Sequence, residues 1–158
     1  MAKRAANRLP LAVPRPLFNP ARPSSAGPAT LVGVPTWLWV DGWRSVSQRT
    51  QAGQVWAVVV AAPVETTWFP GDGSGPIRCT VNTPWTADTA ATSCEHMYVR
   101  SSAGQSASAY PARVVVSWQV TWRGSGDQSG RLPLMQRQMS FPIAVAERQT
   151  VVTVEGNQ

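Results

Sequence analysis

Few residues of this chain could carry out acid–base or nucleophilic chemistry. His96 is the only histidine, and a catalytic histidine needs a nucleophile and an orienting acid beside it. Glu95 is adjacent, but neighbouring residues of a strand point to opposite faces. The eight acidic residues are scattered, and two carboxylates brought together by folding, as in glycosidases, are the one enzymatic alternative left open. We therefore expect a non-catalytic protein that needs no cofactor.

Two cysteines, Cys79 and Cys94, lie 15 positions apart. No C-x-x-C spacing or group of histidines accompanies them, so a metal site is not expected. A structural disulfide between them would stabilise the fold by about 3 kcal/mol in the chain-entropy model and would indicate an oxidising compartment. Two buried free thiols are the alternative.

Eight tryptophans are the residues best suited to contact a ligand. Exposed indole rings stack on sugars and anchor protein partners, whereas buried ones fill a core. We expect most of them in the core. Trp85 lies in a polar stretch between the cysteines, so it is the one predicted to be exposed and the candidate for a ligand platform.

The positive charge is concentrated near the N-terminus. The net charge is +6, and residues 1–30 carry five basic and no acidic residues, which leaves +1 for residues 31–158. Binding of nucleic acid needs a clustered basic face. We therefore expect a basic, proline-rich extension or linker at 1–30, with a possible short helix at 2–9, either solvated or lying as a strap on the domain, and no nucleic-acid partner.

No stretch of the chain predicts a membrane span or a signal peptide. No window holds 18 or more apolar residues. Prolines at 10, 14, 16 and 20 interrupt any apolar segment that could follow the basic residues of the N-terminus. Export of this chain would therefore need a signal encoded upstream of Met1.

The elements that must position these residues are strands. Residues 113–123 alternate with period two, which predicts a half-buried strand whose inner side chains are Val114, Val116, Trp118, Val120 and Trp122. Further strands are expected at 34–40, 54–62, 64–69, 76–81, 94–100, 132–145 and 149–154, with Pro63 ending one of them. About seven short strands and no convincing helix after residue 30 predict an all-β antiparallel sandwich at 31–155.

Trp68 precedes a tight turn, Gly71-Asp72-Gly73, in which glycines accept positive φ and the aspartate can bond its own backbone. His96-Met97-Tyr98 and a valine-rich strand follow later. This order resembles the polycystic-kidney-disease (PKD) repeats, which have a W-D-F-G-D-G corner and an H-x-Y strand. The resemblance covers about residues 54–122 and implies an immunoglobulin-like sandwich with Trp68 as a core anchor. Phe69 replaces the acidic residue of that corner, so calcium is not expected there.

A second resemblance covers roughly residues 2–152. Actinobacterial envelope proteins of uncharacterised function share an L-V-G-x-P-T-W-L-W segment, here Leu31 to Trp39, and a W-x-V-x-W strand, here Trp118 to Trp122. They also share an E-x-Q, here Glu147 and Gln149. The resemblance implies an exported, extracellular or envelope protein.

We therefore expect a structural or adhesive module of an exported envelope protein, with a protein or a cell-wall glycan as its partner. One alternative is a carbohydrate-binding module that uses Trp85. Another is an assembly protein of a phage or conjugation element, in which such sandwiches decorate larger particles.

Overall fold

The computed structural model describes residues 1–88 and 91–147, and most of them lie in β-strands. The elements in chain order are α1 (Ala2–Ala6), β1 (Arg15–Asn19), β2 (Ala29–Leu31), β3 (Pro35–Asp41), β4 (Val46–Ala52), β5 (Val55–Phe69), β6 (Ile77–Cys79), β7 (Glu95–Met97), the 3-10 turn η1 (Ser106–Ser108), β8 (Tyr110–Gly124) and β9 (Gln128–Ala146). The expected all-β fold is confirmed.

The strands form two sheets that pack against each other. The large sheet has the order β2-β9-β8-β5-β4, with β6 also paired to β5, and the small sheet has the order β1-β3-β7. Leu38 and Val40 of the small sheet share one hydrophobic cluster with Val59 and Val116 of the large sheet. Among the described strands, β2 and β9 are the one parallel pair, which departs from the wholly antiparallel arrangement that the sequence predicted.

The alternating strand around residues 113–123 is confirmed as β8. Val114, Val116, Trp118 and Val120 are buried, whereas Arg123 on the opposite face is exposed. Because cross-strand partners share a face, this alternation extends across β5 and β9 and gives the large sheet an apolar inner face and a polar outer face.

Pro63 does not end a strand, which corrects the sequence prediction. β5 runs unbroken from Val55 to Phe69, and the pairing with β8 is irregular between Pro63 and Glu65. A bulge accommodates the missing N–H of proline without ending the ladder. The pairing of β9 with β8 is irregular at the same level, between Trp118 and Val120 of β8.

Three of the strands were not predicted from the sequence. β1, β2 and β4 were not expected because their sequences show no apolar alternation long enough to stand out. The strand expected at 149–154, and Gln149 with it, lie outside the described residues.

Residues 1–30 lie on the sandwich and contribute strands to both of its sheets. α1 is shorter than the possible helix at 2–9, and Ala5, Ala6, Leu9 and Leu11 are buried in the main hydrophobic cluster. β1 pairs with β3, and β2, which pairs with β9, crosses the expected domain boundary between residues 30 and 31. The structure thus shows the strap and not a solvated tail, since the apolar side chains between the charges need cover.

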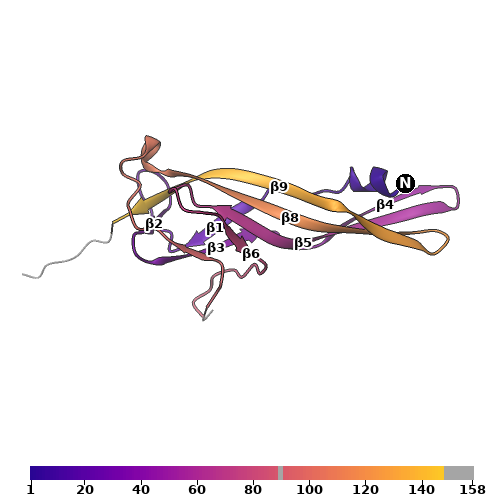
Figure 1. Ribbon diagram of the computed structural model, residues 1–158, viewed down its shortest axis with the longest axis horizontal. Helices are drawn as coiled ribbons and strands as arrows, with labels where there is room; N and C mark the ends of the chain where they lie inside the picture. The colour runs from indigo at the N-terminus through magenta and orange to yellow at the C-terminus, as the bar shows by residue number, and fades with distance from the viewer. Residues whose placement is uncertain (89–90, 148–158) are drawn as a thin grey trace, which may run out of the picture.

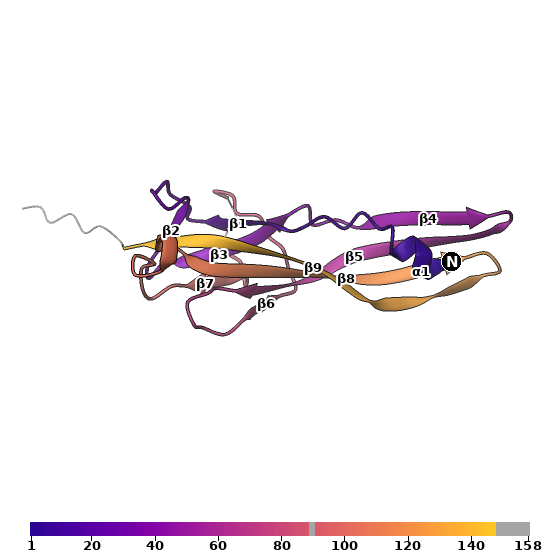
Figure 2. The ribbon, with the colours of Figure 1, turned by 90° about the horizontal axis from the view of Figure 1, so that it is seen from above.

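The molecule is elongated because β5, β8 and β9 continue beyond the small sheet (Figure 1). The small sheet covers the inner face of the large sheet at the end that contains β2. At the other end, called the distal half here, α1 lies against β4, β5 and β8 (Figure 2). The inner face is therefore covered in two parts, by the small sheet at one end and by α1 at the other.

Candidate functional site

The turn after β5 is a tight corner that packs against the start of β8. Trp68 is buried, and its indole N–H donates to Thr66 Oγ1 at 3.0 Å, so the predicted core anchor is confirmed. Gly71 has a φ of +82°, and a Cβ built there would lie 2.5 Å from the carbonyl oxygen of Pro111. Both the backbone conformation and the close approach require glycine at this position.

The corner brings Asp72 next to His96 of β7. His96 Nε2 lies 2.8 Å from Asp72 Oδ2, and the two side chains are 14% and 11% exposed. Ser74 donates its backbone N–H to Asp72 Oδ1 at 3.0 Å and hydrogen-bonds the same oxygen through its hydroxyl. The two halves of the PKD-like pattern therefore meet in space, while Ser74 was missed because no motif marks it.

The surroundings of Asp72 favour its ionised form. Burial raises the pKa of the Asp72 carboxyl, but the hydrogen bonds from Ser74 and His96, together with the attraction of the imidazole, bring the pKa below its ordinary value of 3.8. An ionised carboxylate can only accept, so His96 Nε2 carries the hydrogen of this bond.

Tyr98 continues the cluster into the core. Its hydroxyl donates to the carbonyl oxygen of Pro70 at 3.1 Å, and its ring meets His96 edge-on at 4.6 Å and stacks on Tyr110 at 5.5 Å. Burial raises the pKa of the Tyr98 phenol well above its ordinary value. The tyrosine is thus a neutral donor that fixes β7 to the corner.

Aspartate, histidine and serine meet here, but not in the geometry of a catalytic triad. In a triad the acid and the nucleophile use different ring nitrogens, and the nitrogen that faces the nucleophile has a free lone pair. Here Nε2 faces both Asp72 at 2.8 Å and Ser74 Oγ at 3.4 Å, and it is protonated. Because the Ser74 hydroxyl also bonds Asp72, the arrangement joins the corner to β7 and does not activate the serine.

The predicted disulfide is present between Cys79 and Cys94, whose Cα atoms are 5.5 Å apart. Cys79 ends β6 of the large sheet, and Cys94 immediately precedes β7 of the small sheet. Both residues are buried. The bond therefore fixes the two sheets to each other directly before β7, the strand that carries His96.

Trp85 is exposed, as predicted, with 41% of its surface accessible. The loop that carries it is fixed to β3: the Asn82 side chain forms two hydrogen bonds with the Val40 backbone, and the Trp37 indole donates to the Thr83 carbonyl at 2.5 Å. Trp85 therefore projects from an anchored segment and not from a free loop.

The other indoles are distributed between the core and the surface. Trp37, Trp68 and Trp118 are buried, and the four that are partly buried are Trp39, Trp43, Trp56 and Trp122. Most tryptophans thus lie in or against the core. Trp85 has no exposed tryptophan beside it, so a multi-ring platform does not form in the part of the chain that the structure describes.

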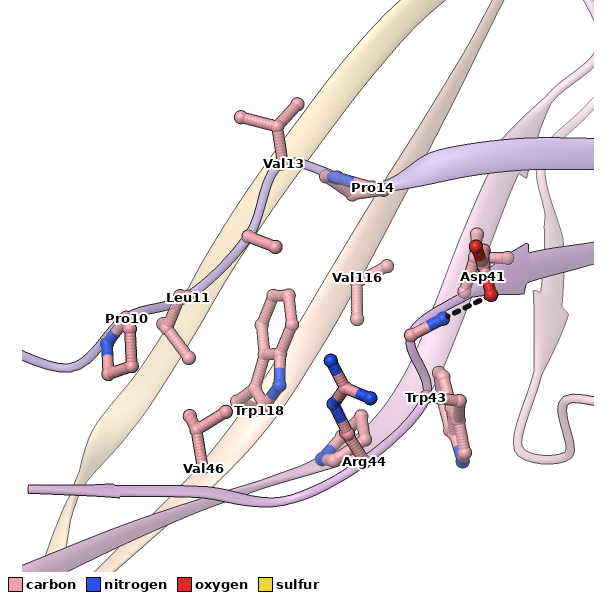
Figure 3. A pocket seen from close by; sticks show the side chains of 14 residues that line it. Pro10, Leu11, Val13, Pro14, Asp41, Trp43, Arg44, Val46, Val116 and Trp118 are labelled. Atoms are coloured by element: carbon pink, nitrogen blue, oxygen red, sulfur yellow. Dashed lines mark hydrogen bonds between the residues drawn. The ribbon is translucent and has the colours of Figure 1, made fainter.

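A small apolar pocket of about 100 Å³ lies where the strap crosses the large sheet. Leu11 from the strap, Val46 from β4 and Trp118 from β8 line it, and the Arg44 side chain extends toward Trp118 (Figure 3). Its volume suits a few water molecules and not a drug-sized ligand. The pocket is a packing gap beneath the strap.

No three His, Cys, Asp or Glu side chains within residues 1–88 and 91–147 stand close enough to hold a metal ion. Over the same residues, no helix has the length and apolarity to cross a bilayer.

The chain matches no protein-family model, no curated protein and no solved structure.

Proposed function

We propose that this protein is a rigid, non-catalytic module of the immunoglobulin or PKD-like type, which serves a structural or adhesive role in an exported envelope protein. The proposal rests on what the potentially reactive side chains contact. Asp72 and Ser74 lie after β5 of the large sheet and bond His96 of the small sheet, so groups that could do chemistry connect the two sheets.

The disulfide supports the same role and an exported location. It links the two sheets beside the corner, and disulfides persist in oxidising compartments outside the cytosol. A module held both by a covalent bond and by a buried polar cluster suits a position that must keep its shape under load.

The structural role of His96 can be tested against catalysis. His96→Gln should lower the free energy of unfolding by about 1–2 kcal/mol, because it removes the imidazole that hydrogen-bonds the Asp72 carboxylate. Met97→Gln is the matched control, because the Met97 side chain on the same strand is 48% exposed, and it should change stability by less than about 0.5 kcal/mol. Turnover of nitrophenyl esters or glycosides that His96→Gln abolishes would contradict the proposal.

Export can be tested through the thiols. Protein secreted into a bacterial periplasm should show no thiol that an alkylating reagent can label under native or denaturing conditions until a reductant is added. A Cys79→Ser/Cys94→Ser variant serves as the blank. Two labelled thiols in the unreduced protein, once denatured, would overturn this part of the proposal.

A carbohydrate-binding module is the second candidate, and the exposure of Trp85 favours it. Binding of a neutral glycan on an array should then be lost in Trp85→Ala and kept in Trp43→Ala, whose indole is partly buried against the core. Equal binding by both variants would exclude Trp85 as the platform.

A further inference from the structure

The outer face of the large sheet carries a group of arginines that the net charge of the chain does not reveal. Val58 of β5 pairs with Arg49 of β4 on one side and with Arg123 of β8 on the other. Arg131 of β9 pairs with Thr121, which is the neighbour of Arg123 on the outer face of β8. Paired residues share a face, and strands are spaced by about 4.8 Å, so Arg49 and Arg123 start about 10 Å apart. All three side chains are exposed.

Trp56 of β5 makes cation–π contacts with two of these arginines. The guanidinium carbons of Arg49 and Arg123 lie over its indole ring, 4.7 and 5.6 Å from the ring centroid. A cation that rests on an aromatic face loses part of its rotational freedom before any ligand arrives. We call Arg49, Trp56, Arg123 and Arg131 the arginine face.

A second contact between an arginine and an aromatic ring lies at the other end of β5. The guanidinium of Arg113 lies 4.0 Å from the ring centroid of Phe69 and donates to Gln138 at 3.1 Å. A shallow depression lined by both polar and apolar residues of β5, β8 and β9 lies around it. From Trp56 to Phe69 the outer face extends for about 40 Å, which makes it a track and not a single point.

Negative charge is nearly absent from this track. Glu65 is the one acidic residue at an outer-face position of the described strands, and Arg78 neutralises it through an ion pair of 2.8 Å. Within residues 1–88 and 91–147, neither hydrophobic cluster includes a side chain of the outer face, and no salt bridge engages the three arginines of the arginine face. These cations are therefore available to a ligand.

We propose that the outer face of β4, β5, β8 and β9 binds an extended acidic polysaccharide, with the arginine face as its main contact and Arg113 as a second. The inference rests on the adhesive role proposed above and names its partner. Guanidinium groups pair with carboxylate or phosphate groups of the polymer. The surrounding Thr121 and Ser129 side chains offer donors and acceptors for sugar hydroxyls.

The structure favours a glycan over a nucleic acid. Single-stranded nucleic acids bind through bases stacked on free aromatic faces, whereas arginines already lie over both Trp56 and Phe69. The disulfide also indicates a location outside the cytosol. Binding through charge and hydroxyl contacts on an open sheet suits a flexible acidic polymer.

Binding of polygalacturonic acid tests the proposal, with dextran as the neutral polymer. The wild-type protein should bind polygalacturonate and not dextran, more weakly at high salt because exposed charges are screened. The variant Arg49→Gln/Arg123→Gln/Arg131→Gln should lose about tenfold or more in affinity. Adding Arg113→Gln should weaken binding further.

A control of equal charge separates the site from the net charge. Arg4→Gln/Arg8→Gln/Arg22→Gln removes three exposed arginines of the N-terminal strap and should keep affinity within about twofold. The proposed site would be wrong if both triple variants lost affinity equally, or if Arg49→Gln/Arg123→Gln/Arg131→Gln lost none. Tighter binding of a DNA oligonucleotide or of polyglutamate would overturn the choice of partner. The structural role is tested separately on the same samples, by thiol labelling and by turnover of the nitrophenyl substrates. If the thiols stay protected and no turnover occurs, the structural role holds even when the polysaccharide does not bind.

Discussion

Gly71 and Gly73 show that two residues of one turn can be required for different reasons. Both have a positive φ, +82° and +91°. A side chain at Gly71 would also collide with the Pro111 backbone, whereas nothing lies within 4 Å of a Cβ at Gly73. Glycine is thus required at position 73 by the backbone conformation alone, and at position 71 by both the backbone conformation and the contact with β8.

Alanine substitutions should separate these two effects. Gly73→Ala should cost about 1–2 kcal/mol, from the left-handed backbone alone. Gly71→Ala adds the clash with a backbone atom that cannot move aside, so we expect a loss larger by about 1–3 kcal/mol. Urea unfolding followed by tryptophan fluorescence measures both, and equal losses would contradict the close approach at Gly71.

Asp72 is the residue whose ionisation should couple most directly to stability. Its pKa is lower in the folded protein than its ordinary value of 3.8. The stabilisation is therefore fully present above the unfolded-state pKa and is lost as the pH falls through the folded-state pKa.

Asp72→Asn should make this contribution visible. We expect a loss of about 1.5 kcal/mol near pH 7, which shrinks below about pH 4 as the wild-type carboxyl takes up its proton. Urea midpoints at neutral and acid pH measure the difference. Asp41→Asn, at a side chain that is 63% exposed, is the control. A difference between Asp72→Asn and wild type that is constant with pH would mean that the charge of Asp72 contributes nothing.

At the scale of elements, the N-terminal strap completes the core of the distal half. β4, β5 and β8 expose an apolar inner face there that the small sheet does not reach, and α1 with the residues after it fills this place. The helix has only five residues and is too short to be stable alone, so its order comes from packing.

Paired substitutions in the strap test this dependence. Leu11 is 8% exposed and Val13 is 55% exposed. Leu11→Ala should cost about 2–3 kcal/mol through the cavity it leaves, and Val13→Ala less than about 0.5 kcal/mol. Thermal unfolding followed by circular dichroism measures both. Similar small effects would show that the strap lies on the sheet without stabilising it.

At the scale of the whole molecule, three long strands set the shape. The longest, β9, has 19 residues, which corresponds to about 60 Å of extended chain. The bulges in β5 and β9 fall at the level of Pro63 and Trp118, which border a pocket lined both by Leu11 of the strap and by Val40 of the small sheet. Bulges increase local twist, so they let one continuous sheet meet two different covers.

Small-angle X-ray scattering tests this shape in solution. A compact domain of this length has a radius of gyration of about 15 Å. The elongated sheet should give a clearly larger value and a distance distribution with a long tail (Figure 1). A radius near the compact value would mean that the distal half folds back in solution.

Local patterns in the sequence were sufficient for part of this protein. The alternation in β8 defined its buried face, the two cysteines predicted their disulfide, and the glycines at 71 and 73 predicted a tight turn. Each of these features depends on residues close together in the chain or on the chemistry of one residue type.

Only the tertiary structure decided the features that join distant segments, because these features depend on which strands pair and in what register. The meeting of Asp72 with His96, the packing of the strap and the gathering of arginines on one face all join segments far apart in the sequence. A net charge of +1 over residues 31–158 gave no sign of a basic face, since a sum over the chain does not record which side chains share a side of a sheet.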